Sequence, residues 1–323
     1  MFSEKSPRIL LLIIVKVILT LSLLPRSASA QIEGDLELLK LVANGYKANL
    51  AKIKMWQGKA IISHEGPYFN PGETVKRKIS VEFVFDANQG AVRWYWNELE
   101  RQITRKNMQS VNENPYFTSG IVKDKTLYML FPVPSAHERP PGNVIVKPAS
   151  LPIRNWDGEF DPMYYFASIE GDLYERLMFY YEQADNPNIG YGKVWRKENR
   201  VFFEKASPGT TAIVTVYKFD LSKSCCITRY FRKYADSIGQ ETWDYDYEDV
   251  NDVFVPKNIR FSQAKPDGSE KTTRIIQFVQ NIMNKPIESE EFSLAKLSLI
   301  PGDIVQEQST GVTFTYNGTN NEK

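Results

Sequence analysis

The feature that most constrains the fold is a pair of alternating runs on either side of a short turn. Residues Ile79–Phe85 place an apolar side chain at every second position, and Val92–Trp96 repeat this pattern after the turn Ala87–Gly90. Side chains on a β-strand point alternately to the two faces of a sheet, so a period of two predicts strands with one apolar face. We therefore expect an antiparallel hairpin that buries one face.

Similar runs recur along the chain. Gln57–Ser63 before the hairpin and Thr126–Phe131 after it are expected to be strands. More runs follow in the second half of the chain: Lys193–Glu204, Thr211–Phe219, Cys226–Tyr234, Glu241–Tyr247, Val253–Gln263, Thr272–Gln280 and Val312–Tyr316. Because no helical pattern separates these later runs, they favour antiparallel meanders over a parallel sheet.

Two stretches have helical spacing instead. Between Asp35 and Lys54 apolar residues recur at steps of three and four, which predicts an amphipathic helix capped by Asp35. A second helical segment follows Asp161 and Pro162, a cap and a first-turn proline, and Gly171 can divide it into two shorter helices. Its apolar stripe consists of Phe166, Ile169, Leu173, Leu177 and Tyr180.

The first thirty residues have the layout of a secretory signal peptide. A basic start is followed by an apolar stretch from Ile9 to Leu24 and by small residues at Ala28–Ala30. The apolar stretch is shorter than the ~20 residues that span a bilayer, and it contains Lys16. We expect cleavage of residues 1–30 after Ala30, a periplasmic or secreted protein, and no transmembrane segment in the chain from Gln31 onward.

Net charge excludes one class of partner. The full chain has 40 basic and 39 acidic residues, and cleavage removes four of the basic residues and one of the acidic ones. The remaining 36 basic and 38 acidic residues give a net charge of −2. Nucleic-acid-binding proteins usually present a strongly basic face, so we expect no nucleic-acid partner.

The strand pattern predicts a single β-rich domain over residues 31–316, followed by a polar tail at 317–323. Six prolines lie between Pro132 and Pro152, too many for a helix or a central strand. We expect residues 132–152 to form an excursion from the domain, with a domain linker as the alternative. The return of a regular pattern directly afterwards, at Asp161, favours the excursion.

Residue types that carry catalysis or bind metals are scarce. His64 and His137 both stand next to loop signals and belong to no HxxxH or HExxH spacing, so we interpret them as surface residues. No GxSxG motif is present. The acidic run Asp244–Asp249 lacks the glycine turn and terminal glutamate of a calcium loop, which favours a solvated strand-and-turn edge. We expect no enzyme, no metal and no cofactor.

Cys225 and Cys226 are adjacent in sequence. Neighbouring side chains on a strand point to opposite faces, so the two thiols do not pair easily. Half-buried strand cysteines are the simpler interpretation, and a strained vicinal disulfide is the alternative.

Several local motifs resemble the lipoprotein-sorting (LolA/LolB-like) superfamily, in its large bacterial extracytoplasmic members. They are Leu38-Leu39 through Tyr46, Gly58-Lys59-Ala60, Val81–Asp86, Val255–Ile259, Asn284–Ile287 and Phe292–Leu294. The resemblance implies an α+β fold in which a strongly curved antiparallel sheet, an unclosed β-barrel, wraps a hydrophobic cavity. An N-terminal helix and a mid-chain helical segment would cover that cavity.

Aromatic residues cluster at Trp94–Trp96, Tyr164–Phe166 and Phe179–Tyr181. Filling of the core is the simpler interpretation for any one of them, and a ligand surface is the alternative. The hypothetical ligand cavity comprises Trp94, Trp96, Phe166, Ile169, Leu173, Leu177 and Tyr180.

The resemblance points to a non-catalytic protein that carries a lipid or an acylated lipoprotein, with an envelope protein as a further partner. The alternative is a related RseB-like sensor or scaffold that binds a protein partner on the same surface. An extracytoplasmic hydrolase and an aromatic-lined carbohydrate binder are weaker alternatives.

Overall fold

The structure is a computed structural model that describes residues 32–67, 72–105, 109–134, 139–152, 159–167, 172–186, 188, 190–206, 214–234, 239–265 and 271–318. The expected signal peptide, His137 and Ile169 lie outside the described residues, so cleavage after Ala30 stays a prediction. Within the described ranges, no helix has both the length and the apolar character needed to cross a membrane.

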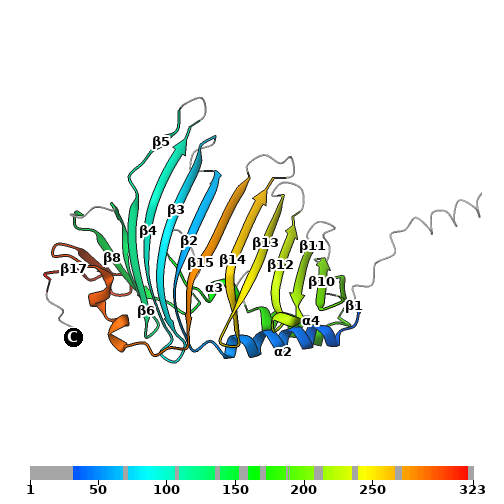
Figure 1. Cartoon of the computed structure of the whole chain (residues 1–323). Helices are drawn as coiled ribbons and strands as arrows, with labels where there is room; N and C mark the ends of the chain where they lie inside the picture. Colours follow the sequence, from blue (N-terminus) through cyan, green and yellow to red (C-terminus); the bar gives the residue numbers. More distant parts are fainter. Residues whose placement is uncertain are drawn as a thin grey trace, which may run out of the picture.

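One large sheet of mostly antiparallel strands forms the body of the molecule (Figure 1). Its first meander consists of β2 (Met55–Pro67), β3 (Thr74–Asp86), β4 (Ala91–Thr104), β5 (Val111–Asn112), β6 (Tyr116–Lys123), β7 (Thr126–Pro134) and β8 (Asn143–Pro148). The second consists of β9 (Gly192–Lys197), β10 (Arg200–Ala206), β11 (Val214–Asp220), β12 (Cys226–Lys233), β13 (Gln240–Val250), β14 (Val253–Ala264) and β15 (Thr272–Met283). Short strands β1 (Ile32–Gly34), β16 (Ile304–Glu307) and β17 (Thr313–Thr315) lie beyond the meanders.

The two meanders are joined side by side, because β15 pairs with β2 in an antiparallel ladder. From this junction the second meander extends to β9 and then β1, and the first extends through β8 to β16 and β17. β4 pairs with β6 along its first half and with β5 near its end. β1 and β17 lie at opposite edges, and no pairing among the described strands joins them, so the sheet is unclosed.

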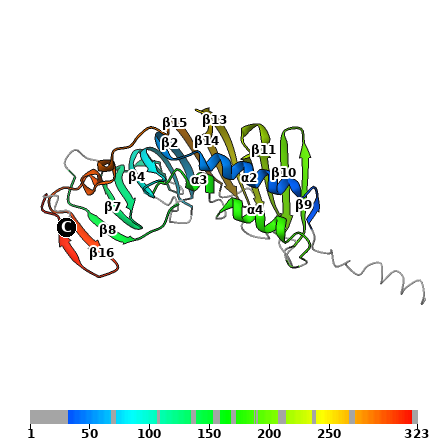
Figure 2. The same ribbon diagram turned by 90° about the horizontal axis from the view of Figure 1, so that it is seen from below.

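The sheet is arched, and the helices lie on its hollow side (Figure 2). α2 (Glu37–Ala51) contacts α4 (Leu173–Glu182) and also strands β9, β10 and β12. The short helix α3 (Tyr164–Ala167) lies on the same side. We call this side the concave face and the opposite side the convex face. The expected α+β class, with a curved, unclosed antiparallel sheet and helices from the N-terminal and mid-chain segments, is confirmed.

α2 is fixed to the sheet by its apolar stripe and by one buried amide. Tyr46 is fully buried, and Asn49 donates to the carbonyl of Phe254 at 2.8 Å and accepts from the amide of the same residue at 3.0 Å. At Gly45, a Cβ would lie 2.4 Å from the Sγ of Cys225, so glycine lets the helix approach the start of β12. Because Asn49 satisfies both backbone groups of Phe254, it sets the position of α2 over β14.

The cap predictions were right for one helical segment and wrong for the other. The side chain of Asp161 accepts from the amide of Met163 at 2.8 Å, and Asp172 caps α4 by accepting from the amides of Tyr174 and Glu175. The prediction that Asp35 caps the first helix is wrong. α2 begins at Glu37, and Leu36, at the cap position, makes no side-chain hydrogen bond.

One strand prediction also differs from the structure, and the prediction for the acidic run agrees with it. Residues Lys193–Glu204 form the hairpin of β9 and β10 rather than one strand, because the chain turns at Glu198, where φ is +56°. The acidic run Asp244–Asp249 pairs with β14 along its whole length but with β12 only at Asp244, so most of it lies at a local strand edge next to the turn at Asn251, as expected.

The proline-rich segment 132–152 contains part of the sheet. β7 reaches Pro134, and β8 pairs with both β7 and β16, contrary to the expectation of an excursion without central strands. The prolines stand at or near strand ends, and the residues Val144–Val146 between them keep the amides that a ladder needs.

The two cysteines are more buried than predicted. Cys226 begins β12, and Cys225 lies in the preceding turn with φ of +60°. Both are free thiols and both are buried, because α2 packs over them. The predicted strand position is therefore right for Cys226 and wrong for Cys225, and both thiols are more buried than expected.

A C-terminal segment crosses the convex face of the first meander. Its two 3₁₀ turns, η2 (Ser289–Phe292) and η3 (Leu294–Leu297), bury Phe292 and Leu297 against Val84 and Ile121. Polar contacts add to this packing: Glu291 pairs with Arg93, and the hydroxyl of Tyr95 donates to the carbonyl of Lys296 at 2.5 Å. This segment covers one end of the convex face.

Candidate functional site

Trp94 and Trp96 lie on the concave face of β4, and both are buried. Gly120 of β6 lies directly opposite Trp94, and a Cβ at Gly120 would be 2.0 Å from the Cζ2 atom of that indole. The indole therefore lies against the bare backbone of β6. Trp94 therefore packs tightly in the interior at this end of the sheet.

The other described members of the hypothetical cavity belong to α4. Leu173 and Leu177 are buried in the core, and Tyr180 packs against Phe203 with ring centroids 5.2 Å apart. The hydroxyl of Tyr180 accepts from the Nζ of Lys205 at 2.7 Å. Phe166 lies in α3, and its side chain, like Ile169, lies outside the described residues.

The structure therefore places these residues at two ends of one continuous apolar cluster. Eight successive strand pairings separate β4, which carries the tryptophans, from β10, against which α4 packs. The middle of the concave face, between these ends, was not singled out by the sequence.

An apolar strip crosses this middle region. Cross-strand partners lie on the same face of a sheet, so the register places one side chain from each of five neighbouring strands in a row. We call it the deep row, and it consists of Tyr245, Ile259, Ile276, Ile62 and Ile79. All five are buried. Four strand spacings of about 4.8 Å give this strip a length of roughly 19 Å.

A second row lies two residues farther along each strand. We call it the rim row, and it consists of Trp243, Phe261, Arg274, His64 and Arg77. In contrast to the deep row, every member is only partly buried. The rim row changes from aromatic to cationic along its length, beginning with the ring pair Trp243–Phe261, whose centroids are 4.6 Å apart.

The prediction of His64 as a surface residue near a loop is corrected here. His64 lies within β2, between Arg274 of β15 and Arg77 of β3, and its Nδ1 atom is shielded from solvent. The prediction rested on the segment after His64, whose glycines and prolines indicate turns. Pairing with β3 extends β2 to Pro67, and pairing with β15 reaches Glu65, so His64 lies inside the sheet.

The cationic end of the rim row is tied to a buried glutamate. Glu98 is buried and pairs with Arg77 at 2.5 Å and with Arg101 at 3.5 Å. Arg101 also pairs with Glu113, at 3.2 Å. These two arginines and two glutamates balance each other in charge.

Arg274 differs from its neighbours in the rim row. Its side chain is half-buried, and it makes no ion pair or hydrogen bond with another side chain in the described part of the protein. It therefore contributes a positive charge that the balanced Arg77–Glu98–Arg101–Glu113 cluster does not offset.

Three buried tyrosines line the interior near the deep row. Burial raises the pKa of Tyr46, Tyr245 and Tyr247 well above the usual value, so all three stay neutral at ordinary pH. The hydroxyl of Tyr245 has no hydrogen-bond partner among the described residues. It is thus a polar group available within an apolar strip.

The single helical turn α3 lies over this part of the concave face. Its Tyr165 packs edge-on against Phe278 at a centroid distance of 6.3 Å, and against Phe160 at 5.8 Å. Tyr164 and Tyr165 are also close enough to Tyr245 to influence its pKa electrostatically. The cover over the deep row therefore includes an element of just four residues.

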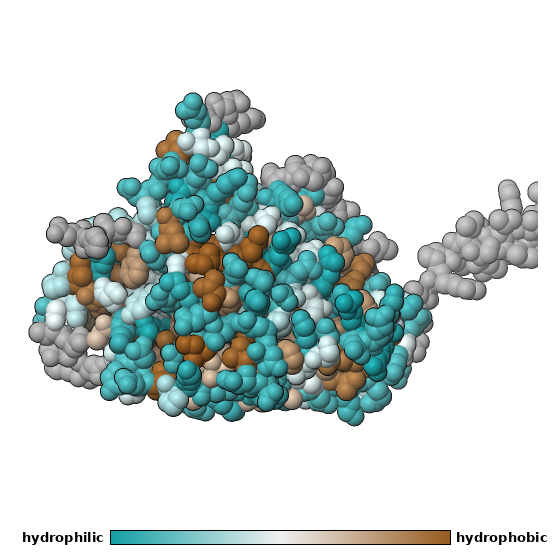
Figure 3. All heavy atoms as spheres, in the orientation of Figure 1, coloured by the Kyte–Doolittle hydropathy of each residue, from teal (hydrophilic) through white to brown (hydrophobic). Residues whose placement is uncertain are grey.

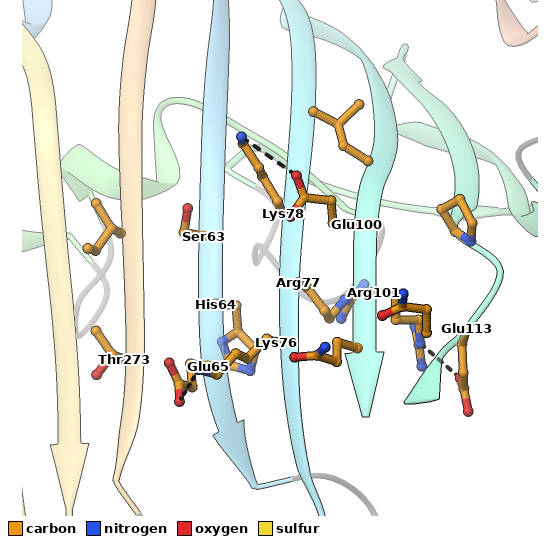
Figure 4. Close-up of a pocket in the computed structure, with 15 residues that line it drawn as sticks. Ser63, His64, Glu65, Lys76, Arg77, Lys78, Glu100, Arg101, Glu113 and Thr273 are labelled. Atoms are coloured by element: carbon orange, nitrogen blue, oxygen red, sulfur yellow. Dashed lines mark hydrogen bonds and ion pairs between the residues drawn. The ribbon is translucent and has the colours of Figure 1, made fainter. Parts of the chain in front are cut away.

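A hollow of about 710 Å³ opens on the convex face, and its lining also includes His64, Arg77 and Arg101 (Figure 4). Its walls include two ion pairs, Lys78–Glu100 and Lys76–Glu65. Exposed Leu99 and Ile275 border it, and apolar residues are visible among polar ones over the central strands of this face (Figure 3). Because its charged groups are largely paired with each other, this hollow presents no free charge cluster for a ligand.

The concave face offers few groups that could ligate a metal ion. In the described ranges, no group of three or more His, Cys, Asp or Glu side chains is arranged to hold a metal ion. The rim row and deep row together offer apolar area, two partly buried aromatic rings and positive charge. This combination suits an elongated ligand with an apolar body.

Sequence reasoning did not identify the deep and rim rows. Each member lies in or beside an expected strand, so its period-two spacing was visible, but the register between strands separated by two hundred residues was not. The rim row could have been found by a search for aromatic residues in some predicted strands that face arginines in neighbouring predicted strands.

Comparisons with known proteins give distant structural matches. No protein-family model and no curated protein matches the chain. A DUF1329 family protein from Desulfovibrio piger has a TM-score of 0.38 and 11% identity, over 80% of this chain and 99% of that chain. A domain from Vibrio parahaemolyticus, suggested to be an outer membrane lipoprotein-sorting protein, has a TM-score of 0.39 and 11% identity, over 81% and 99%. A β-barrel-like DUF1849 protein from Brucella abortus has a TM-score of 0.28 and 9% identity, over 72% and 100%.

Proposed function

We propose that this is an extracytoplasmic, non-catalytic binding protein that carries a lipid or an acylated lipoprotein against the concave face of its sheet. The observation that supports it is the deep row, a continuous apolar strip that borders the partly buried rings of Trp243 and Phe261. An acyl chain is long, narrow and apolar, and it matches such a strip. Opening would displace α3, a cover of one helical turn.

The expected affinity is modest. Burial of an acyl chain gains about 0.8 kcal/mol per methylene, so about ten methylenes give ~8 kcal/mol. Loss of translational and rotational freedom on association costs about 4–15 kcal/mol, which offsets much of that gain. Reversible binding is what a carrier needs, because it must release its cargo.

A titration with a neutral acyl probe tests the proposal. The methyl ester of 11-(dansylamino)undecanoic acid should bind the wild-type protein with a rise in dansyl fluorescence. Phe261→Asp should abolish binding, because an unpaired carboxylate in an apolar contact is strongly disfavoured. Ile275→Asp is the matched control, since Ile275 lies on the neighbouring strand but is exposed on the convex face.

The control variant should bind as the wild type does, with both variants checked for folding by circular dichroism. Absence of ester binding by the folded wild type, or greater loss in Ile275→Asp than in Phe261→Asp, would reject a carrier function. The RseB-like sensor or scaffold is the alternative that would then be favoured, with a protein partner on the concave face.

A further inference from the structure

We propose that the ligand of the concave face is an anionic amphiphile whose negatively charged head binds Arg274 in the rim row while its acyl chain lies on the deep row. The inference rests on the proposed function and specifies its ligand class. It follows from the rim row, in which aromatic residues are followed by Arg274, and from the apolar deep row beside it.

The first step is the position of Arg274 between apolar and polar surroundings. Its neighbour in the rim row on one side is Phe261, and on the other side is His64. Two residues along β15, on the same face, lies Ile276 in the deep row. A head held at Arg274 would therefore place the attached chain directly on the apolar strip.

The second step is charge. The Arg77–Glu98–Arg101–Glu113 cluster is neutral overall, and Glu98 is occupied by hydrogen bonds from Arg77 and from the amide of Tyr116. Arg274 has no such acidic partner among the described side chains. A half-buried guanidinium without a counter-charge favours binding of an anion, because the ion pair replaces lost hydration.

The third step is the hydrogen-bonding geometry of the guanidinium. Arginine presents several N–H donors in a planar fork, which suits the oxygens of a carboxylate or a phosphate. Both chemistries occur on acyl lipids, as fatty acids and as phospholipids. The structure points to the shared feature, an anionic oxygen head on an acyl chain.

The test compares a carboxylate probe with its neutral methyl ester, which has the same acyl chain and fluorophore. The acid form of 11-(dansylamino)undecanoic acid should bind the wild type roughly ten-fold more tightly than its methyl ester, the scale of a net charge-assisted hydrogen bond. Arg274→Gln should remove this preference by weakening the acid and leaving the ester unchanged. Arg274→Lys should retain part of it, because the charge remains.

Arg260→Gln is the matched control. Arg260 lies on the adjacent strand β14 but is exposed on the convex face, opposite Ile275. It should leave both affinities unchanged. Displacement of the bound ester by laurate and by lysophosphatidylglycerol, with lysophosphatidylcholine as a zwitterionic comparison, distinguishes a carboxylate head from a phosphodiester head.

Equal affinity of the wild type for acid and ester would overturn this inference while leaving the carrier function intact. A preference that persists in Arg274→Gln would also overturn it, because another group would then hold the head. Failure of the wild type to bind either probe would reject the proposed function itself. The wild-type comparison decides the matter even if Arg274→Gln does not fold.

Discussion

Replacement of Gly120 by alanine should destabilise the protein through a clash with Trp94. The added Cβ would lie 2.0 Å from Cζ2 and 2.4 Å from Cη2 of an indole that is fully buried. Ordinary contacts between carbon atoms need about 3.5–4.0 Å, so the ring must shift by more than an ångström in a close-packed interior. Overpacking of this kind costs about 1–3 kcal/mol.

A double-mutant cycle separates the clash from other effects. Trp94→Leu alone should cost about 3 kcal/mol, because it leaves a void where the ring was. In that background Gly120→Ala should become neutral or stabilising by about 0.5–1 kcal/mol, since alanine is preferred to glycine in a strand. The coupling free energy should therefore be about 2–3 kcal/mol.

Urea unfolding followed by circular dichroism measures all four corners of this cycle. A neutral Gly120→Ala in the wild-type background would contradict the placement of the Trp94 ring against β6. An equal cost of Gly120→Ala in both backgrounds would show that the indole is not the obstacle.

Four further outcomes are expected. Glu98→Ala should lower the free energy of unfolding in urea by about 3–5 kcal/mol, because it leaves Arg77 and Arg101 without their shared partner. As a control, Glu82→Ala breaks the exposed pair with Lys59 and should lower it by at most about 1 kcal/mol. Burial acts to raise the pKa of Asp303, but hydrogen bonds from Arg139 and from the amides of Gly142 and Ile300 lower that pKa overall. The ionised carboxylate therefore stabilises the fold above pH about 3.9, and this stabilisation is lost as the pH falls below that value. Asp303→Asn should reduce the loss of stability at acid pH in urea melts. Burial raises the pKa of the Cys226 thiol to about 12, so neither cysteine should react with a thiol reagent at pH 8 until urea unfolds the protein, and rapid labelling of the native state would contradict the packing of α2 over them. Protein recovered from a cell envelope should begin at Gln31 by N-terminal sequencing, and an intact Met1 in membranes would contradict cleavage.

The local pattern of the sequence was sufficient for the fold class. The alternation at Ile79–Phe85 and Val92–Trp96 predicted the hairpin of β3 and β4, and helical spacing predicted α2 and α4. These patterns report which face of an element is apolar, a local property. The capping prediction failed at Asp35 because α2 begins at Glu37, so that Leu36 and not Asp35 stands at the cap position.

The candidate site needed information that the sequence does not carry. Trp94 and Leu177 were both correctly expected on apolar faces, yet they lie at opposite ends of the concave face. The rim row exists because β15 pairs with β2, a contact between residues two hundred positions apart. The register of that ladder places Arg274 beside His64, and a shift of β15 by one residue relative to β2 would send Arg274 to the convex face.

The most direct test of the central claim is photocrosslinking with a fatty acid that carries a diazirine on its acyl chain, followed by mass spectrometry of the labelled peptides. The account predicts that label is incorporated at concave-face residues of β13, β14 and α3, including Trp243, Phe261 and Tyr165, and that unlabelled laurate competes it away. Label confined to convex-face residues such as Leu99 and Ile275, or no labelling above that of the unfolded chain, would contradict the claim that the concave face binds an acyl chain.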